Sequence, residues 1–281
     1  MIEEKIAEAR ALKEGYALFS PLTNLPYVEC EEEEFNDQVF LYASKDDAEE
    51  AADAYEEKGI RVNVKELKTV QMKAEKKQEN IFLNQVRQHL STLPFIGVNA
   101  VFYVSAGGEG APIELKELLP DGYEKKIQEN NFYQPNLQLT GMYLMQEARR
   151  KKEFVDMKHL QELDEEFSSN LVKSRLFLAV LPPQGHEKDQ QIDLRECKLP
   201  YLKHQNGDHF FPLFSDMWEF QKYTRGQKDL RPIQVPFAEI TKFWVKDAKA
   251  YMLNPMGYSL PLTKEMVPRL LEKFGVSQIP S

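Results

Sequence analysis

The amino-acid sequence predicts an α+β fold built from two tandem similar modules, each a small mixed or antiparallel sheet flanked by helices. Three observations carry this prediction. Apolar runs bounded by turn residues predict strands, and apolar residues at helical spacing predict the helices between them. The same order of predicted elements occurs twice along the chain. The length of 281 residues suits two ordinary domains or one large one.

Two stretches with the same layout mark corresponding points of the repeat. Residues 25–44 and 199–215 each begin Leu-Pro-Tyr, pass through a polar tip and return through an apolar run, VFLYAS in one and FFPLFS in the other. This layout predicts two strands around a turn. At the second tip, Asn206-Gly207 favours a type I′ turn, whose two central residues both need a positive φ angle.

A helix with readable ends is expected after each hairpin. In the first module Ser44 is the expected N-cap, with Asp47 three residues later, and Gly59 follows the expected last turn. In the second module Ser215 and Gly226 bracket a helix about one turn shorter. The two helices therefore occupy equivalent places in the repeat.

The remaining elements also correspond. Each module continues with a short strand and an apolar-faced segment, then closes with a strand, a glycine-containing turn and an apolar helix, over residues 97–119 and 248–271. An opening helix precedes the first strand of each module. The apolar-faced segment is a predicted helix carrying Phe82, Val86 and Leu90 in the first module, and it holds Phe237, Ile240 and Trp244 in the second.

These correspondences predict where the modules begin and end. We expect the first module over residues 1–120, a helical connector over 121–152 and the second module over 153–281. Within the connector, residues 136–150 carry Leu139, Met142 and Tyr143 at helical spacing, which predicts a helix that packs against the modules.

Three motifs of the second module point to a known family. They are FFPLFSDMWEF, RPIQVPFAEI and YMLNPMGYSLPLTKEMVPRLL, and between residues 171 and 274 they resemble the SseB family, the enhanced serine sensitivity proteins of bacteria. The first module is similar more loosely, through VFLYASKDDAEEAADAYEEKGIRV and FIGVNAVFYV, and it lacks the Asn-Pro pair. The resemblance implies an α+β fold, a bacterial cytoplasmic setting and a link to amino-acid (serine) tolerance. It brings no catalytic residues.

Composition and charge narrow the classes of partner. Hydrophobic residues make up 42% and charged residues 29%, which is a globular composition. The formal net charge of −9 repels phosphate backbones and anionic lipid, so neither nucleic acid nor membrane is an expected partner. The start, MIEEKIAEAR, carries acidic residues where a secretory or mitochondrial leader needs basic ones, and no apolar run approaches the roughly 18 residues of a membrane span. We therefore expect a cytoplasmic protein.

Metal and cofactor sites are not expected. Cys30 and Cys197 lie outside any C-x-x-C pattern, which argues against a disulfide framework or a structural zinc site. His204, Asp208 and His209 surround the second hairpin tip, where an exposed hairpin is favoured over a metal cluster. The glycine-rich loop of residues 106–110 lacks the Gly-Lys-Ser/Thr of a phosphate loop.

Four residues of the second module are candidate ligand or partner contacts. Asn254-Pro255-Met256-Gly257 has the composition of a type I turn with Asn bonding its own backbone; the functional alternative places the Asn254 amide and the Tyr258 hydroxyl at the rim of a ligand cleft. Three large apolar residues occur in a row at 243–245, so at least one should point away from the core. Phe243 and Trp244 are therefore either covered by the connector helix or available to a partner.

The function predicted from these observations is binding without catalysis. No nucleophile elbow, zincin helix, Walker loop or C-x-x-C pair occurs in the sequence. The expected partner is a protein, a second copy of the chain or a small metabolite. The alternative is an enzyme with a dispersed active site in the cleft between the modules, because catalytic geometry is spatial and a sequence does not display it.

Overall fold

The computed structural model describes residues 2–31, 33–34, 36–73, 80–183, 185, 196–225, 227, 229–246 and 248–275. By their internal contacts they form two compact units. Unit 1 comprises Met1–Asn131 and Gly141–Leu160, and unit 2 comprises Phe132–Thr140 and Gln161–Ser281. Two helices, α5 (Pro135–Ala148) and α6 (Met157–Lys173), each contribute residues to both units. The helix expected over residues 136–150 is confirmed as α5, whereas the predicted module boundaries stay a prediction.

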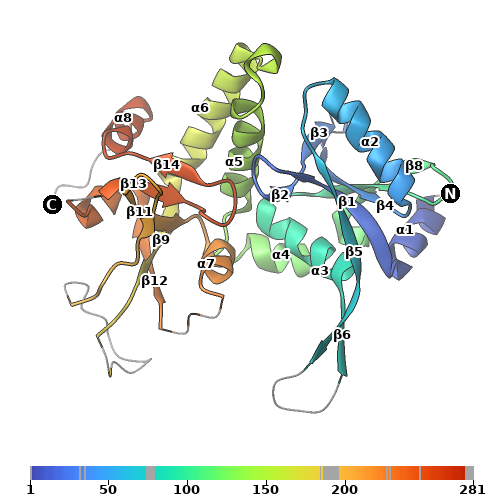
Figure 1. The fold of residues 1–281 in the computed structure, drawn as a ribbon, viewed down its shortest axis with the longest axis horizontal. Helices are drawn as coiled ribbons and strands as arrows, with labels where there is room; N and C mark the ends of the chain where they lie inside the picture. The colour runs from blue at the N-terminus through green and yellow to red at the C-terminus, as the bar shows by residue number, and fades with distance from the viewer. Residues whose placement is uncertain are drawn as a thin grey trace. The chain divides into compact units, whose positions relative to one another are not determined.

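Unit 1 is a mixed sheet with helices (Figure 1). Its sheet has the order β6-β5-β1-β4-β7-β8, with β2 paired to β1 and β3 paired to β4. Among its described pairs, β4 and β7 are parallel and the others are antiparallel. The elements are α1 (Ile2–Ala11), β1 (Glu14–Ser20), β2 (Leu25–Pro26), β3 (Glu29–Glu31), β4 (Asn36–Tyr42), α2 (Lys45–Glu57), β5 (Asn63–Lys73), β6 (Asn80–Asn84), α3 (Gln85–Thr92), the 3-10 helix η1 (Leu93–Ile96), β7 (Ala100–Val104), β8 (Gly110–Glu114), the 3-10 helix η2 (Leu115–Glu117) and α4 (Tyr123–Gln128).

Unit 2 is a second, smaller mixed sheet with helices (Figure 1). Its sheet has the order β12-β9-β11-β13-β14, with β10 paired to β11. After the part of α6 that belongs to it come β9 (Arg175–Val180), β10 (Leu202–Lys203), β11 (His209–Phe214), α7 (Met217–Tyr223), β12 (Arg231–Pro236), the 3-10 helix η4 (Phe237–Phe243), β13 (Ala248–Leu253), β14 (Leu260–Leu262) and α8 (Met266–Lys273). The α+β class predicted from the sequence is confirmed.

The two sheets share a strand order. Strands β5-β1-β4-β7-β8 of unit 1 correspond in position to β12-β9-β11-β13-β14 of unit 2. The parallel pairs also correspond, because β4 pairs in parallel with β7 and β11 pairs in parallel with β13. Strand order alone does not separate a duplication from two folds that reached one topology independently. The tandem repeat therefore stays a prediction, with a topology that is compatible with it.

Each unit has its own apolar core. In unit 1 the continuous apolar run of β4 is buried and packs against α2, whose Ala48 is fully buried. In unit 2 the aromatic residues of β9, β11 and α7 form the corresponding cluster. Burial of such side chains stabilises each unit by roughly 1.5–3 kcal/mol per large residue. The clusters contain Leu18, Tyr27, Phe40, Tyr42, Ala48 and Val104 in unit 1, and Phe177, Ala179, Phe214, Phe220 and Leu230 in unit 2.

The second hairpin forms as predicted, but its turn type is different. β10 and β11 are antiparallel, with Lys203 opposite His209. Gly207 has a φ angle of 89°, whereas Asn206 does not have a positive φ, so the type I′ turn is wrong. The backbone N–H of Gly207 donates to the His204 carbonyl at 2.9 Å, and the backbone N–H of His204 donates to the Asp208 backbone carbonyl at 2.9 Å. The loop is thus longer than two residues and needs a left-handed conformation only at glycine.

One of the predicted helix starts is confirmed and the other is wrong. Ser44 is the N-cap of α2, as expected, although its side chain makes no capping hydrogen bond. The N-cap of α7 is Asp216 and not Ser215, because the Asp216 carboxylate accepts the backbone N–H of Glu219 at 3.0 Å. Gly226, the expected end of α7, lies outside the described residues.

Two predicted helical segments of unit 1 are also corrected. Phe82 lies in strand β6, since the Asn84 side chain caps α3 by accepting the Arg87 N–H at 3.1 Å and fixes the helix start at Gln85. The apolar helix expected at the end of the first module is only the 3-10 turn η2. Pro120 explains this, because the residue before a proline is disfavoured in helical conformation.

Candidate functional site

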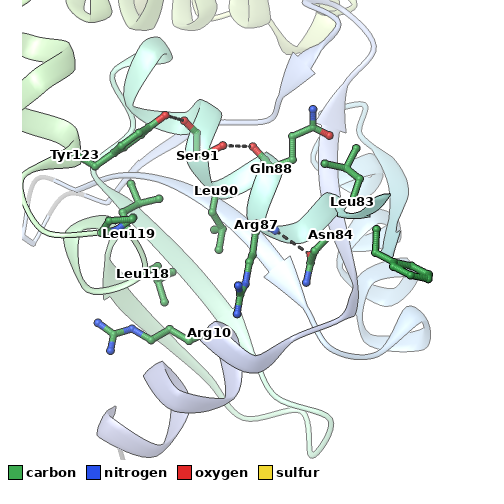
Figure 2. Close-up of a pocket in the computed structure, with 12 residues that line it drawn as sticks. Arg10, Leu83, Asn84, Arg87, Gln88, Leu90, Ser91, Leu118, Leu119 and Tyr123 are labelled. Carbon is green, nitrogen blue, oxygen red and sulfur yellow. Dashed lines mark hydrogen bonds between the residues drawn. The ribbon is translucent and has the colours of Figure 1, made fainter. Parts of the chain in front are cut away.

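The described residues of unit 1 enclose a pocket of about 730 Å³ (Figure 2). This volume falls within the range of roughly 300–1,000 Å³ that is typical of ligand sites. The pocket is built from α1, β6, α3, the segment after η2, and α4. The lining comes from parts of the chain that are far apart in sequence, so the fold of unit 1 creates the site.

The floor of the pocket is aliphatic. Leu90 of α3 is 2% exposed and Leu119 is 8% exposed, and Leu83, Leu118 and Pro120 complete the apolar lining. Figure 2 shows Leu118 and Leu119 on the left of the site, with Leu90 to their right. An apolar floor of this kind binds aliphatic or aromatic groups by removing their surface from water.

Two arginines supply the positive charge of the pocket. Arg10 comes from α1 and Arg87 from the first turn of α3, and both side chains lie in the lower part of the view in Figure 2. The Arg10 Nε donates to the backbone carbonyl of Glu117. Within the described part of the chain, no carboxylate lies within ion-pair distance of either guanidinium. Both cations are therefore available to a ligand.

Uncharged polar groups complete the lining. The Tyr123 hydroxyl of α4 donates to the Ser91 carbonyl of α3 at 3.1 Å, which ties these two helices together at the upper end of the pocket (Figure 2). The Ser91 hydroxyl donates to the Gln88 carbonyl at 2.8 Å. The described lining holds no carboxylate, imidazole or thiol. It is suited to holding a group that is partly apolar and partly anionic, and Tyr123, whose hydroxyl bonds Ser91, is its one side chain of a type used in acid–base catalysis.

A buried polar network lies in unit 2 around Asn254. The Asn254 Oδ1 accepts the backbone N–H of Ser215 at 2.8 Å, and its Nδ2 donates to the Ser215 hydroxyl at 2.9 Å and to Gln138 Oε1 at 3.2 Å. Asn254 itself has a φ angle of 51° and is fully buried. We call the set Gln138, Ser215, Asp216, Glu219, Lys222, Asn254 and Tyr258 the Asn254 network.

Two acids lie inside the Asn254 network. Gln138 Nε2 donates to Asp216 Oδ2 and to Glu219 Oε1, both at 3.0 Å, and Lys222 Nζ pairs with Glu219 Oε1 at 2.7 Å. Burial, followed by the charge of Glu219, raises the pKa of Asp216 to about 7. Burial and the same two acids raise the pKa of Tyr258 well above its ordinary value. The network therefore holds ionisable groups away from water, where charge is costly.

The structure places the predicted contacts Asn254 and Tyr258 in this network. Both are fully buried, and the Gly257 N–H donates to the Asn254 carbonyl at 2.9 Å, which confirms a turn over Asn254-Pro255-Met256-Gly257. The sequence predicted that the Asn254 side chain bonds its own turn, and this is wrong. The amide instead bonds Gln138 of α5 and the backbone N–H of Ser215, just before α7. Their role as ligand contacts stays a prediction.

Phe243 and Trp244 lie at the end of η4 and are half-buried. The Trp244 ring packs edge-on against the Tyr251 ring, with 5.0 Å between the ring centroids. The two residues are not part of the pocket or of the Asn254 network. Their role as partner contacts also stays a prediction.

Trp244→Ala is expected to lower the free energy of unfolding by about 2 kcal/mol, because it removes a half-buried aromatic contact. The molar mass of the protein in solution should not change. Urea denaturation and light scattering, with Phe243→Ala measured in parallel, check this. A wild-type dimer that either substitution converts into a stable, folded monomer would contradict it and would make the row a self-association surface.

The histidine hairpin and the glycine-rich loop are turns in the structure. His204 is exposed and its Nδ1 lies 3.0 Å from Asn206 Oδ1, while the His209 ring packs on Tyr201 at 4.7 Å. The loop of residues 106–110 joins β7 to β8. Among the described residues, no cluster of three or more His, Cys, Asp or Glu side chains is placed to hold a metal ion.

One part of the chain matches a family model in comparisons with known proteins. Residues 156–269 match the family model for the SseB protein N-terminal domain. This confirms the resemblance predicted for the second module over those residues, while the first module is not matched. No curated protein matches the chain.

Two solved structures are similar over their full length at low scores. Tic22 from Plasmodium falciparum has 11% sequence identity and a TM-score of 0.21, with 98% of each chain covered. Anabaena Tic22, described as a protein of protein transport, has 10% identity and a TM-score of 0.20, with 99% of each chain covered. Where the structure describes the chain, no helix combines the length and apolar character needed to cross a bilayer.

Proposed function

We propose that this protein is a non-catalytic, SseB-like binding protein and that the pocket of unit 1 is its binding site. The observation that carries the proposal is the lining of that pocket: an aliphatic floor next to two arginines without an acidic partner among the described residues. Such a site binds a protein segment or a small molecule through its shape, apolar surface and charge.

The absence of carboxylate, imidazole, thiol and amine side chains from the described lining supports binding over catalysis. The residue with a near-neutral pKa, Asp216, is fully buried in the Asn254 network of unit 2 and does not line the pocket of unit 1. A catalytic group must reach its substrate, so burial of this kind favours a structural role. An enzyme with a dispersed active site remains the alternative, and no contact in the described residues favours it.

The proposal includes cytoplasmic action and a link to amino-acid (serine) tolerance. The match of residues 156–269 to the SseB N-terminal domain supports this part. A bacterial host that lacks the gene should grow differently from its parent when L-serine is added, and the wild-type chain should restore the parental growth. Equal growth of both strains over a serine titration would remove the link.

A substitution at the pocket mouth tests the binding site. Gln88 is exposed on α3 and lines the pocket, so Gln88→Trp should fill the site without disturbing the core. A screen of metabolites and short peptides by thermal shift should find ligands that stabilise the wild type, by about 2.7 kcal/mol at 100 times the dissociation constant. Those ligands should not stabilise Gln88→Trp.

The matched control is Glu50→Trp, which places the same side chain on an exposed position of α2 away from the pocket. It should respond to each ligand as the wild type does. Ligands that stabilise Gln88→Trp as strongly as the control would show that binding occurs elsewhere, and turnover of any ligand would support the enzyme.

A further inference from the structure

The pocket of unit 1 adjoins the edge of a sheet. Strand β6 ends the strand order of unit 1, so one side of its backbone has no partner strand among the described residues. Figure 1 shows β6 and the end of β5 as a ribbon that extends beyond the rest of the sheet. Three residues of β6, Phe82, Leu83 and Asn84, also line the pocket. An unpaired edge next to a pocket is the arrangement that captures extended segments of other proteins.

Phe82 adds an apolar contact outside the floor. Its side chain is 67% exposed, which is unusual for a phenylalanine next to an open pocket. A small molecule seated on Leu90 and Leu119 would leave much of this ring in water, whereas a chain segment lying along β6 would cover it. Aromatic side chains at the margin of a groove commonly serve as anchors for protein partners.

The positive charge of the pocket favours a segment that carries a negative charge. The chain as a whole has a formal net charge of −9, yet the described lining holds Arg10 and Arg87 and no carboxylate. A guanidinium binds a carboxylate through paired, charge-assisted hydrogen bonds. The pocket is therefore locally positive and favours an anion, although the chain as a whole is negative.

We propose that this pocket captures an extended segment of a partner protein that presents a large apolar side chain and a carboxylate on the same face. The apolar side chain lies on the leucine floor beside Phe82, the carboxylate is bound by Arg10 and Arg87, and the backbone of the segment pairs with β6. This inference rests on the proposed function and names the chemistry of the ligand. In an extended segment the two side chains are two residues apart, because alternate residues share a face.

The test uses the full chain and a fluorescein-labelled peptide, Thr-Leu-Thr-Glu-Thr-Leu-Thr, which presents Leu and Glu on one face. Fluorescence anisotropy should show saturable binding that weakens as the salt concentration rises. Replacing Glu by Gln in the peptide should weaken binding to the wild type about tenfold. The same replacement should have little effect on the Arg10→Ala/Arg87→Ala double variant, because the carboxylate has lost its partners there.

Further variants keep the result interpretable if the double variant is unstable. Arg87→Gln alone should reduce the affinity for the Glu peptide, and its melting should match that of the wild type because the described residues give the guanidinium no ion pair. Phe82→Ser should also weaken binding without lowering stability, since the side chain is exposed. Glu50→Trp again serves as the control that binds normally.

The outcomes separate this inference from the proposed function. If the wild type binds the Glu and Gln peptides equally and Gln88→Trp abolishes both, or if only small metabolites bind at the pocket, the proposed function stands and the acidic segment is wrong. If no peptide or metabolite binds, or if all bind Gln88→Trp normally, both proposals fail. A dimer that Gln88→Trp dissociates would identify a second copy as the occupant and overturn the partner segment.

Discussion

Asn254→Ala is expected to lower the free energy of unfolding of unit 2 by about 4 kcal/mol. The substitution removes three side-chain hydrogen bonds, to the Ser215 N–H, the Ser215 hydroxyl and Gln138. It leaves the buried Ser215 N–H without the acceptor that it has in the wild type. It also places alanine at a φ angle of 51°, a left-handed conformation that asparagine tolerates better.

The two tryptophans, Trp218 and Trp244, both lie in unit 2, so intrinsic fluorescence during urea denaturation follows this unit selectively. Asn254→Gly removes the amide but tolerates the positive φ, and it should be about 1 kcal/mol more stable than Asn254→Ala. Asn24 of unit 1 is a second control, because it is exposed and has a φ angle of 56°. Asn24→Ala, followed by circular dichroism, should cost only about 1 kcal/mol. Equal losses at positions 24 and 254 would mean that backbone strain, and not the network, explains the effect.

The stability of unit 2 is expected to fall as the pH rises from about 4 to about 7. Burial and Glu219 raise the pKa of Asp216 from its ordinary 3.8 to about 7, so the folded unit binds this proton more tightly than the unfolded chain does. The stabilisation is complete when the pH is below the pKa of Asp216 in the unfolded chain, and it is lost as the pH approaches the pKa of Asp216 in the folded unit. Within this window Asp216 alone contributes a slope of up to about 1.4 kcal/mol per pH unit.

Asp216→Asn tests this prediction because the variant cannot ionise while asparagine is a good N-cap. The difference in unfolding free energy between wild type and variant, read from tryptophan fluorescence, should change between pH 4 and pH 7. A constant difference over that range would show that Asp216 does not titrate there in the folded protein.

The titration of His89 in unit 1 is the reason for following unit 2 alone, through its tryptophan fluorescence. Burial, with a smaller effect of Lys65, lowers the pKa of His89 from 6.5 to about 4. The folded unit 1 therefore favours the neutral imidazole, and its stability is lost as the pH falls from 6.5 through 4. The two units depend on pH in opposite directions, and a signal from the whole chain would partly cancel.

Local patterns in the sequence predicted local structure well. The Asn254 turn, α2 and α5 follow from turn composition, capping residues and apolar spacing, which act over a few residues. The partners of the Asn254 amide were not predictable in this way, because Gln138 lies 116 residues away in α5. The prediction that Ser215 caps α7 was wrong for the same reason. The backbone N–H of Ser215 donates to the distant Asn254 side chain, and the Asp216 carboxylate caps α7 instead.

The pocket of unit 1 was missed entirely by sequence reasoning. Arg10, Arg87 and Leu119 come from three segments with no common motif, and only the fold brings them to one site. Phe82 was assigned to a helix face because it is spaced helically from Val86 and Leu90. The Asn84 cap is the local signal that separates the strand from the helix, and asparagine three residues before the Arg87 N–H was the pattern to look for.

The chain cannot be divided by a single cut. Residues 132–140 belong to unit 2 although residues 141–160, which follow them, belong to unit 1. A fragment that starts at residue 153 would therefore lack Gln138, the side chain that donates to both buried acids, and Gln134, whose amide donates to the Arg175 carbonyl at 2.7 Å. A fragment meant to fold as unit 2 by itself therefore has to include residues 132–140, for example as a separate peptide or through circular permutation. Recombination that exchanges whole modules at residue 153 would meet the same obstacle. The exchanged unit 2 would be separated from its own residues 132–140 and joined to the α5 residues of a different protein.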